Sequence, residues 1–392
     1  MNCIIMKKIG ILTQPLLNNY GGLLQNYALQ QVLMQLGYEP ETIDHGVRKQ
    51  PWLNNLLVKI KVLIACWLHF GKCAHKPYQL TEKELRIISQ NNNRFIDKNI
   101  KRTEKFYDNK KLDALISRGA YYGYVVGSDQ CWRPSYACGF LNEMFLSFIS
   151  SERDIKRIAY AASFGTDVWE FSPEKTERCA RLAQKFDLIT VREKSGIALC
   201  RKHLGVEAQH VLDPTMLLNK EDYIHVVEAE HAPISEGTLF HYILDPTNEK
   251  KILVDSVASK LGLIPFTVMP KFQAENRTKE DIKKRINDCV FPSVTNWLRS
   301  FMDAKMVIVD SFHGTVFSII FNKLFWVLSN EERGNARFES LLGMFGLEDR
   351  MISVDLFNED FNWNKSIEWE RVNKIREREV ARCKLLLENA LN

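Results

Sequence analysis

A histidine lies among small and polar residues in the segment DSFHGT, residues 310–315, between a predicted strand and an apolar helix. A helix start presents free backbone N–H groups and a partial positive charge, so this segment suits an anion. His313 would deliver a proton to that anion. The residues that would cap the helix or donate to the anion are Ser311, Gly314 and Thr315. The structural alternative is a helix cap beside a core histidine.

Cationic residues that follow predicted strands could bind the same anion. Arg192 directly follows a strand in LITVREKSG, so its guanidinium could fork onto a carboxylate or a phosphate. Further cations lie near the last strand of the chain, at Lys323, Arg333 and Arg337. The structural alternative for each arginine is a solvated surface charge.

Three polar turns complete the candidate site. Gly127–Gln130 (GSDQ) and Ser163–Gly165 (SFG) each follow a predicted strand, and residues 14–25 (QPLLNNYGGLLQ) follow the first one. Amides and glycines of this kind could bind sugar hydroxyls at close backbone approach. They are also ordinary turn residues, and as turns they need no function.

Short apolar runs alternate with helical patterns along the chain, which indicates an α/β fold. The strands predicted from these runs are 8–12, 41–44, 121–126, 158–162, 188–191, 210–212, 238–244, 264–268, 306–309 and 324–327. Each ends in small or polar residues, as parallel strands buried on both faces do. We therefore expect two Rossmann-like domains that face a cleft, with the polar strand ends at the cleft.

A change of composition at 228–237 (EAEHAPISEG) predicts the linker between the domains. The first domain would cover 1–227 and the second 238–392. Residues 48–118 are rich in Lys, Arg and Asn without a strand period, and predict a helical insertion in the first domain. Apolar residues at helical spacing predict one long amphipathic helix over 369–391, at the end of the second domain.

Composition and missing motifs exclude several classes of protein. The 392 residues carry a net charge of +5, too weak an excess to indicate nucleic-acid binding but suited to an enzyme of anionic substrates. The nine cysteines form no CxxC pair, so their spacing predicts no zinc or iron–sulfur site. Walker A, G-x-G-x-x-G, H-E-x-x-H and G-x-S-x-G motifs are absent. Without a secretory leader, we expect a cytoplasmic protein with reduced thiols.

One apolar stretch, Trp52–Phe70, is interrupted by Lys59 and Lys61 and would barely span a bilayer. Flanking basic residues would allow it to lie on anionic lipid at the inner face of the membrane. The alternative is a helix buried against its own domain.

Seven segments in order resemble the polysaccharide pyruvyl transferase family, over roughly residues 8 to 350. They are NNYGGLLQNYALQQVLMQLGY, VVGSDQCW, YAASFGT, VREKSG, VLDPTMLL, DSFHGTVFSIIFNKLF and RFESLLGMFGL. The resemblance implies a GT-B-like fold and transfer of pyruvyl from phosphoenolpyruvate to a sugar of a bacterial capsule, exopolysaccharide or cell-wall glycan. The product would usually be a cyclic ketal, with release of phosphate.

The resemblance also assigns roles to residues. The histidine of the family aligns with His313, the general acid, and its strand-end arginine with Arg192. A donor-binding basic residue matches either Arg333 or Arg337. Asp310 or Asp129 would orient the histidine or take the hydroxyl proton. Further donor-binding residues would be Ser311, Gly314, Thr315, Ser163 and Gly165, and the acceptor-binding residues Gln14, Asn18, Asn19, Tyr20, Gly21, Gln25 and Gln130.

The scheme requires neither a metal nor a cofactor, because phosphoenolpyruvate enters as a substrate. The acceptor would be a sugar, with the 4,6-diol of galactose as the first to try, or an undecaprenyl-diphosphate-linked oligosaccharide. Two alternatives stay open: a nucleotide-sugar-dependent glycosyltransferase on the same fold, and a non-catalytic glycan-binding assembly protein.

Overall fold

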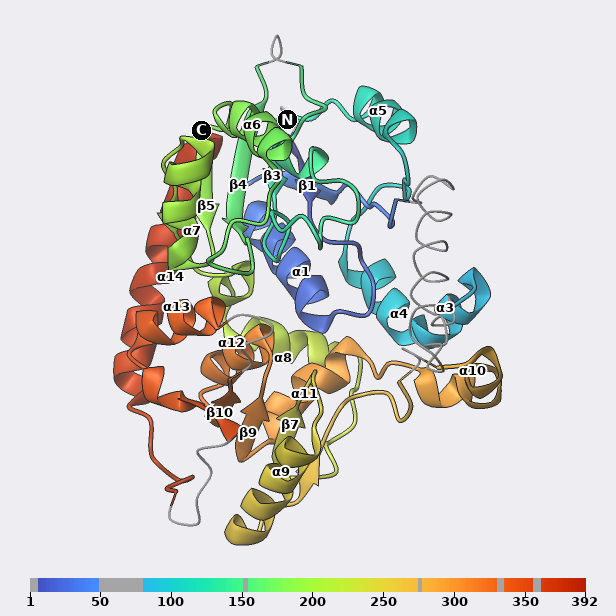
Figure 1. The fold of residues 1–392 in the computed structure, drawn as a ribbon, viewed down its shortest axis with the longest axis vertical. Helices are drawn as coiled ribbons and strands as arrows, with labels where there is room; N and C mark the ends of the chain where they lie inside the picture. The colour runs from blue at the N-terminus through green and yellow to red at the C-terminus, as the bar shows by residue number, and fades with distance from the viewer. Residues whose placement is uncertain (1–5, 49–79, 151–153, 274–276, 330–334, 355–360) are drawn as a thin grey trace, which may run out of the picture.

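The computed structural model describes residues 6–48, 80–150, 154–273, 277–329, 335–354 and 361–392. Within these ranges the chain forms two parallel β-sheets with helices packed around them, and a long C-terminal helix runs down one side of the molecule (Figure 1). The predicted fold class, α/β with two Rossmann-like halves and a long final helix, is therefore confirmed.

The first sheet has six strands in the order β2-β1-β3-β4-β5-β6, and every neighbouring pair is parallel. Its strands are β1 (Lys8–Leu12), β2 (Glu39–Thr42), β3 (Gly123–Val126), β4 (Lys156–Ala162), β5 (Leu188–Val191) and β6 (Gln209–His210). All four residues of β3 are buried, as expected of a central strand covered by helices on both faces.

The second sheet has five parallel strands in the order β11-β10-β9-β7-β8. They are β7 (Leu239–Tyr242), β8 (Pro265–Phe266), β9 (Met306–Val309), β10 (Leu324–Leu328) and β11 (Met351–Ile352). Strand β11 was not predicted, because two residues are too short a run for a period to be visible.

The α-helices are α1 (Tyr20–Gln35), α3 (Glu82–Ile88), α4 (Gln90–Asn99), α5 (Asn109–Arg118), α6 (Pro173–Ala183), α7 (Lys194–Leu199), α8 (Lys220–Ala229), α9 (Asn248–Leu261), α10 (Lys279–Arg285), α11 (Val294–Asp303), α12 (Phe312–Ile320), α13 (Ala336–Phe345) and α14 (Trp369–Leu391). The short helical turns are η1 (Glu143–Phe145), η2 (Cys200–Leu204), η3 (Pro214–Leu217), η4 (Ile286–Cys289) and η6 (Glu348–Arg350). Helix α14 has the predicted bounds, and it packs against both α13 and β4.

The predicted insertion is helical where it is described, at α3, α4 and α5. Its apolar stretch at 52–70 lies outside the described residues. The side chain of Asn91 donates to the carbonyl of Phe291 at 2.8 Å, so α4 contacts the second half of the chain. Among the residues that the structure describes, no helix is both long and apolar enough to cross a membrane.

One hydrophobic core joins the two halves. Tyr20, at the start of α1, stacks on Trp297 of α11 with ring centroids 5.7 Å apart, and its hydroxyl donates to the carbonyl of Pro292 at 2.8 Å. Both rings are fully buried. The start of α1 is therefore fixed against the second half, and this brings the loops of the two sheets together. The domain limits at 227 and 238 stay a prediction.

Candidate active site

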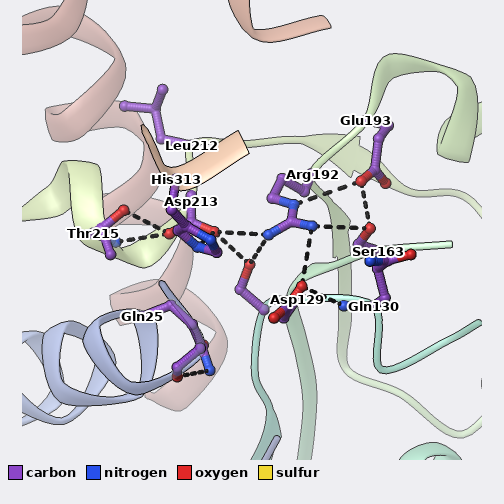
Figure 2. Close-up of polar contacts among 12 residues, drawn as sticks. Gln25, Asp129, Gln130, Ser163, Arg192, Glu193, Leu212, Asp213, Thr215 and His313 are labelled. Carbon is purple, nitrogen blue, oxygen red and sulfur yellow. Dashed lines mark hydrogen bonds and ion pairs between the residues drawn. The ribbon is translucent and has the colours of Figure 1, made fainter. Parts of the chain in front are cut away.

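Polar residues from four neighbouring strands of the first sheet meet at one edge of that sheet. Strand β3 is followed by Gly127–Gln130, β4 by Ser163–Gly165, β5 by Arg192, and β6 by Asp213. Because the strands are parallel, their carboxyl ends lie at the same edge. Figure 2 shows that His313, from the second half, lies against this edge beside Asp213.

Arg192 is the centre of this cluster, and its side chain is only 1% exposed. Its guanidinium lies 3.2 Å from Asp213, 3.5 Å from Asp129 and 3.5 Å from Glu193 (Figure 2). It also lies 4.2 Å from the ring centroid of Phe312. Burial alone would lower the pKa of Arg192, but the three carboxylates outweigh it and raise the pKa above its ordinary value. The charge of Arg192 is therefore already offset inside the protein.

Asp213 connects Arg192 to His313. One carboxylate oxygen, Oδ2, accepts a hydrogen bond from Ser128 at 2.7 Å and from Arg192 at 3.2 Å. The other, Oδ1, accepts two bonds from Thr215, at 2.7 Å from its hydroxyl and 3.0 Å from its amide. Burial would raise the pKa of Asp213, but His313, Arg192 and Thr215 together hold it well below its usual range.

His313 lies in the first turn of α12, directly after strand β9. The cap of this helix is Ser311, whose hydroxyl accepts from the amide of Gly314 at 3.0 Å. The Nε2 atom of His313 lies 3.6 Å from Oδ2 of Asp213. A Cβ on Gly21 would lie 2.0 Å from Nδ1 of His313, so only glycine lets the ring pack this close to α1. The ring is thus held between the starts of α1 and α12.

Asp129 joins the loop after β3 to the start of α1. It has a left-handed φ of 68°, which a short polar side chain tolerates better than most. Its Oδ2 accepts from the amide of Asn19 at 3.1 Å, and Asn19 also caps α1 by accepting from Gly22 at 3.1 Å. Gln14 donates to the carbonyl of Gln130 at 3.0 Å. Several predicted donor- and acceptor-binding residues are therefore neighbours in one network.

Ser163 and Gly165 lie on the other side of Arg192. The hydroxyl of Ser163 donates to Glu193, accepts from Arg192 at 3.2 Å, and accepts from the amide of Gly165 at 3.0 Å. Gly165 has a left-handed φ of 74°, and a Cβ there would meet the side chain of Gln130 at 2.1 Å. This loop can only close on Gln130 if the residue is glycine.

Of the two candidate donor-binding arginines, Arg337 is buried at the start of α13. Burial and the nearby charge of Arg192 lower its pKa, although Glu193 and Asp129 act in the opposite direction. Arg333 lies outside the described residues.

Asp310 is placed away from the histidine ring. Its carboxylate accepts from the amides of Leu244 and Asp245, at 2.6 and 3.1 Å, and from Nζ of Lys250 at 2.8 Å. It therefore holds the turn after β7. The carboxylate that lies beside His313 is that of Asp213. The expectation that Asp310 or Asp129 orients the histidine or takes the hydroxyl proton stays a prediction.

Three of the predicted acceptor-binding residues have side chains that contact other residues of the protein. Tyr20 is buried in the core, and Gln25 is fully buried and donates to Thr13 at 2.6 Å. Asn18 accepts from Asn92 of α4 at 3.0 Å. Their roles toward an acceptor stay predictions.

The sequence interpretation missed Asp213 and Glu193 as members of the site. Asp213 lies three residues after β6, in the VLDPTMLL segment, so the strand-end argument applied to Arg192 would also have selected it. Glu193 follows Arg192 directly, and side chains of adjacent residues usually point apart. Nothing in the spacing indicated that the side chains of Arg192 and Glu193 would both hydrogen-bond to Ser163.

The arrangement combines a buried imidazole, an ionised carboxylate beside it and two buried arginines. An imidazole at a helix start can give a proton to a bound anion, and a neighbouring carboxylate fixes the orientation of the ring. Acid-catalysed transfer from an anionic donor fits this set of groups.

Comparison with solved structures finds proteins of similar fold at low sequence identity. The chain is similar to the UDP-N-acetylglucosamine 2-epimerase of Rickettsia bellii, with 11% identity, 98% of this chain and 97% of that chain covered, and a TM-score of 0.47. It is also similar to the Methanocaldococcus jannaschii UDP-GlcNAc 2-epimerase in complex with UDP-GlcNAc and UDP, with 10% identity, 96% of this chain and 93% of that chain covered, and a TM-score of 0.46. A third similar structure is the spinosyn rhamnosyltransferase SpnG in complex with thymidine diphosphate, with 12% identity, 99% of this chain and 100% of that chain covered, and a TM-score of 0.43.

No curated protein matches the chain. The family model of polysaccharide pyruvyl transferase matches residues 19–332, from the cap of α1 to the segment after β10. This range contains the loops that carry Asp129, Arg192, Asp213 and His313. The match confirms the resemblance seen in the sequence: the chain belongs to the polysaccharide pyruvyl transferase family.

Proposed function

We propose that this protein transfers the pyruvyl group of phosphoenolpyruvate to two hydroxyls of a sugar and releases phosphate. The observation that carries the proposal is the placement of His313. Its ring is buried at a helix start, 3.6 Å from the ionised carboxylate of Asp213, beside the cluster around Arg192. Membership of the family supports the transferase class, and the donor and the ketal product are our inference.

Recognition of the donor needs positive charge, because phosphoenolpyruvate carries both a phosphate and a carboxylate. We assign this role first to Arg337, since three carboxylates already offset the charge of Arg192. The anion would offset the two effects that lower the pKa of Arg337, which are burial and Arg192. Backbone N–H groups at the start of α12 would supply further donors.

The chemistry begins with a proton from His313 to the methylene carbon of phosphoenolpyruvate, which becomes a methyl group. The adjacent carbon, C2, is then an oxocarbenium-like electrophile, and one sugar hydroxyl adds to it and loses its proton. A second hydroxyl of the same sugar attacks C2, the bond to the phosphate oxygen breaks, and a cyclic ketal closes. One hydroxyl proton restores the proton on His313 and the other leaves with phosphate.

We assign Asp213 as the positioning residue for His313, because its carboxylate is fixed by four hydrogen bonds from Ser128, Arg192 and Thr215. Asp129 is the carboxylate nearest to the start of α1, through Asn19. It is therefore our candidate to take the proton of the first sugar hydroxyl and pass it to the departing phosphate, while the proton of the second hydroxyl restores His313.

The acceptor is proposed as a galactose unit of a bacterial surface polysaccharide or of its lipid-diphosphate-linked precursor, on the cytoplasmic face of the membrane. Amide side chains around the start of α1, Gln14 and Asn19 among them, suit sugar hydroxyls. The 4- and 6-hydroxyls of galactose can close a six-membered ketal.

The test is release of phosphate from phosphoenolpyruvate with a panel of mono- and disaccharides, followed by mass spectrometry of each product. A sugar that gains one pyruvyl unit supports the proposal and identifies the acceptor. His313→Ala should lower kcat by about 10²-fold or more, as expected for loss of a general acid. Transfer from a UDP- or GDP-sugar instead would show a glycosyltransferase, and binding of a glycan without turnover would show a non-catalytic protein.

A further inference from the structure

The segment that carries Asp213 is held at four backbone groups by α14. Arg382 donates to the carbonyl of His210 at 2.7 Å, the amide of Leu212 donates to Sγ of Cys383 at 3.4 Å, and Arg376 donates to the carbonyls of Met216, at 3.3 Å, and Leu218. Asp213 lies in the middle of this segment, residues 209–218. Three residues of one helix therefore fix the backbone on both sides of the carboxylate.

These contacts lie in a buried layer. Cys383 is fully buried, and Tyr160 of β4 adds a hydrogen bond of 3.2 Å to the carbonyl of Leu212. Arg376 is half-buried, and burial lowers its pKa. Desolvation of a cation costs free energy, and the hydrogen bonds from Arg376 to the two backbone carbonyls offset part of that cost.

The same helix is anchored to the second half of the chain. Arg371, in the first turn of α14, donates to the carbonyls of Phe345 and Gly346 at 3.1 and 3.0 Å. These carbonyls lie at the end of α13, where a cation also complements the helix dipole. Helix α13, which lies beside α14 in Figure 1, begins with Ala336 and Arg337. Helix α14 therefore connects the helix of the candidate donor-binding arginine to the Asp213 segment.

We propose that α14 is a strut that sets the position of the Asp213 carboxylate relative to His313, with Arg376 as a positioning residue. An α-helix is stiff, and the stretch from Arg371 to Cys383 spans about 18 Å at 1.5 Å per residue. A shift of α14 would move the backbone of 209–218 with it. The catalytic part of the inference rests on the proposed function, whereas the mechanical part does not.

The first test is Arg376→Met, which keeps a long side chain but removes the two bonds to Met216 and Leu218. We expect amide hydrogen exchange in 209–218 to quicken at least tenfold while 306–309 of β9 is unchanged. We also expect kcat to fall about tenfold, with KM for phosphoenolpyruvate within twofold, because donor binding is assigned elsewhere. Arg376→Lys, which restores a cationic donor, should recover part of kcat.

Arg378→Met is the matched control, since the Arg378 side chain is 73% exposed and forms an ion pair with its neighbour Glu379 on the same helix. If exchange in 209–218 is unchanged in Arg376→Met, or if it quickens with no loss of kcat, the strut is overturned. Should Arg376→Met not fold, Cys383→Ala replaces it, with Cys383→Ser as the variant that keeps an acceptor for Leu212.

If the parent protein transfers nothing from phosphoenolpyruvate, the proposed function fails by itself and the strut is judged by two other measurements. One is the exchange rate of 209–218. The other is the rate at which diethylpyrocarbonate modifies His313, followed by peptide mass spectrometry. Both Asp213→Asn and Arg376→Met should change this rate in the same direction, and an unchanged rate in Arg376→Met would overturn the strut.

Discussion

Nε2 of His313 lies 3.6 Å from Oδ2 of Asp213, although the two residues follow strands of different sheets. Neither half of the chain can build this pair alone. Asp213 is buried and ionised, with Ser128, Arg192 and Thr215 as its other partners. The packing of one sheet's edge against the other therefore decides whether the proposed acid has its carboxylate, and the candidate site is a property of the assembled molecule.

Replacement of Asp213 by Asn should lower kcat about tenfold or more with a small change in KM for phosphoenolpyruvate. Asparagine keeps the shape of the side chain but loses the negative charge that orients His313. The measurement is steady-state phosphate release over a range of donor concentrations.

The control for this variant is Asp222→Asn, which makes the same chemical change at the capping box of α8. It should keep kcat within twofold of the parent. A parent-like kcat in Asp213→Asn would remove Asp213 from the mechanism.

Gly21→Ala should lower kcat about 10²-fold by displacing the ring of His313. The added Cβ would lie 2.0 Å from Nδ1 and 2.2 Å from Cγ of that ring, and a displacement of this size is enough to misalign a proton donor. Gly343→Ala is the matched control, because Gly343 is also in a helix and its Cβ would meet only Glu348, at 3.6 Å.

Measured together, the two glycine variants distinguish an effect on the position of the His313 ring from an effect on the stability of the fold. Gly343→Ala should leave kcat unchanged and raise stability by up to about 1 kcal/mol, the helix preference of alanine over glycine. If Gly21→Ala had both the kcat and the melting temperature of the parent, the packing of His313 against α1 would have no catalytic role.

Arg192→Met should destabilise the protein by about 3–5 kcal/mol, because it leaves buried carboxylates without their cation. Asp129, Glu193 and Asp213 all lie within 3.5 Å of the guanidinium. Urea unfolding measures the loss. Arg201→Met, at an exposed pair with Glu207, should leave the urea midpoint close to that of the parent.

This result would also decide how to interpret lost activity. If Arg192→Met unfolds in less urea than the parent and Arg192→Met/Asp213→Asn recovers part of the difference, Arg192 acts mainly as an internal counter-charge. An Arg192→Met protein as stable as the parent would instead leave Arg192 available to bind the donor.

The fold was predictable from the sequence because its strands are short, apolar and closed by polar residues. Strands β1, β5 and β9 have their predicted bounds, and so does α14. The strand-end argument also placed Arg192 and His313 near one another, because the strand ends of both predicted domains were expected to face a common cleft.

Side-chain partners were harder to predict, because they depend on how two sheets pack. Asp310 and Asp213 both follow strands closely, and the spacing does not say which carboxylate faces His313. The carboxylate of Asp310 accepts hydrogen bonds from the amides of Leu244 and Asp245 and from the ammonium group of Lys250. Those groups come from the β7–α9 loop and the first turn of α9, 60 to 66 residues away in the sequence.

The pH dependence of stability should report on the ionised Asp213. Its pKa in the folded protein is held below the ordinary value of 3.8, so the unfolded chain binds its proton at higher pH than the folded one. The stability contributed by this carboxylate is therefore fully present above the unfolded pKa, about 3.9, and is lost as pH falls through the folded pKa. The unfolding free energies of the parent and Asp213→Asn should differ by a constant amount from pH 5 to 8.

Below about pH 4 this difference should shrink, because the unfolded chain takes up the proton that the folded protein excludes. Urea titrations of both proteins at pH 7, 5 and 3.5 measure it, with Asp222→Asn as the control. A difference between parent and Asp213→Asn that grew on acidification would mean that the folded protein binds the Asp213 proton more tightly than the unfolded chain does. The pKa of Asp213 in the folded protein would then lie above its ordinary value, and Arg192 and Thr215 would not be holding the carboxylate in its ionised form.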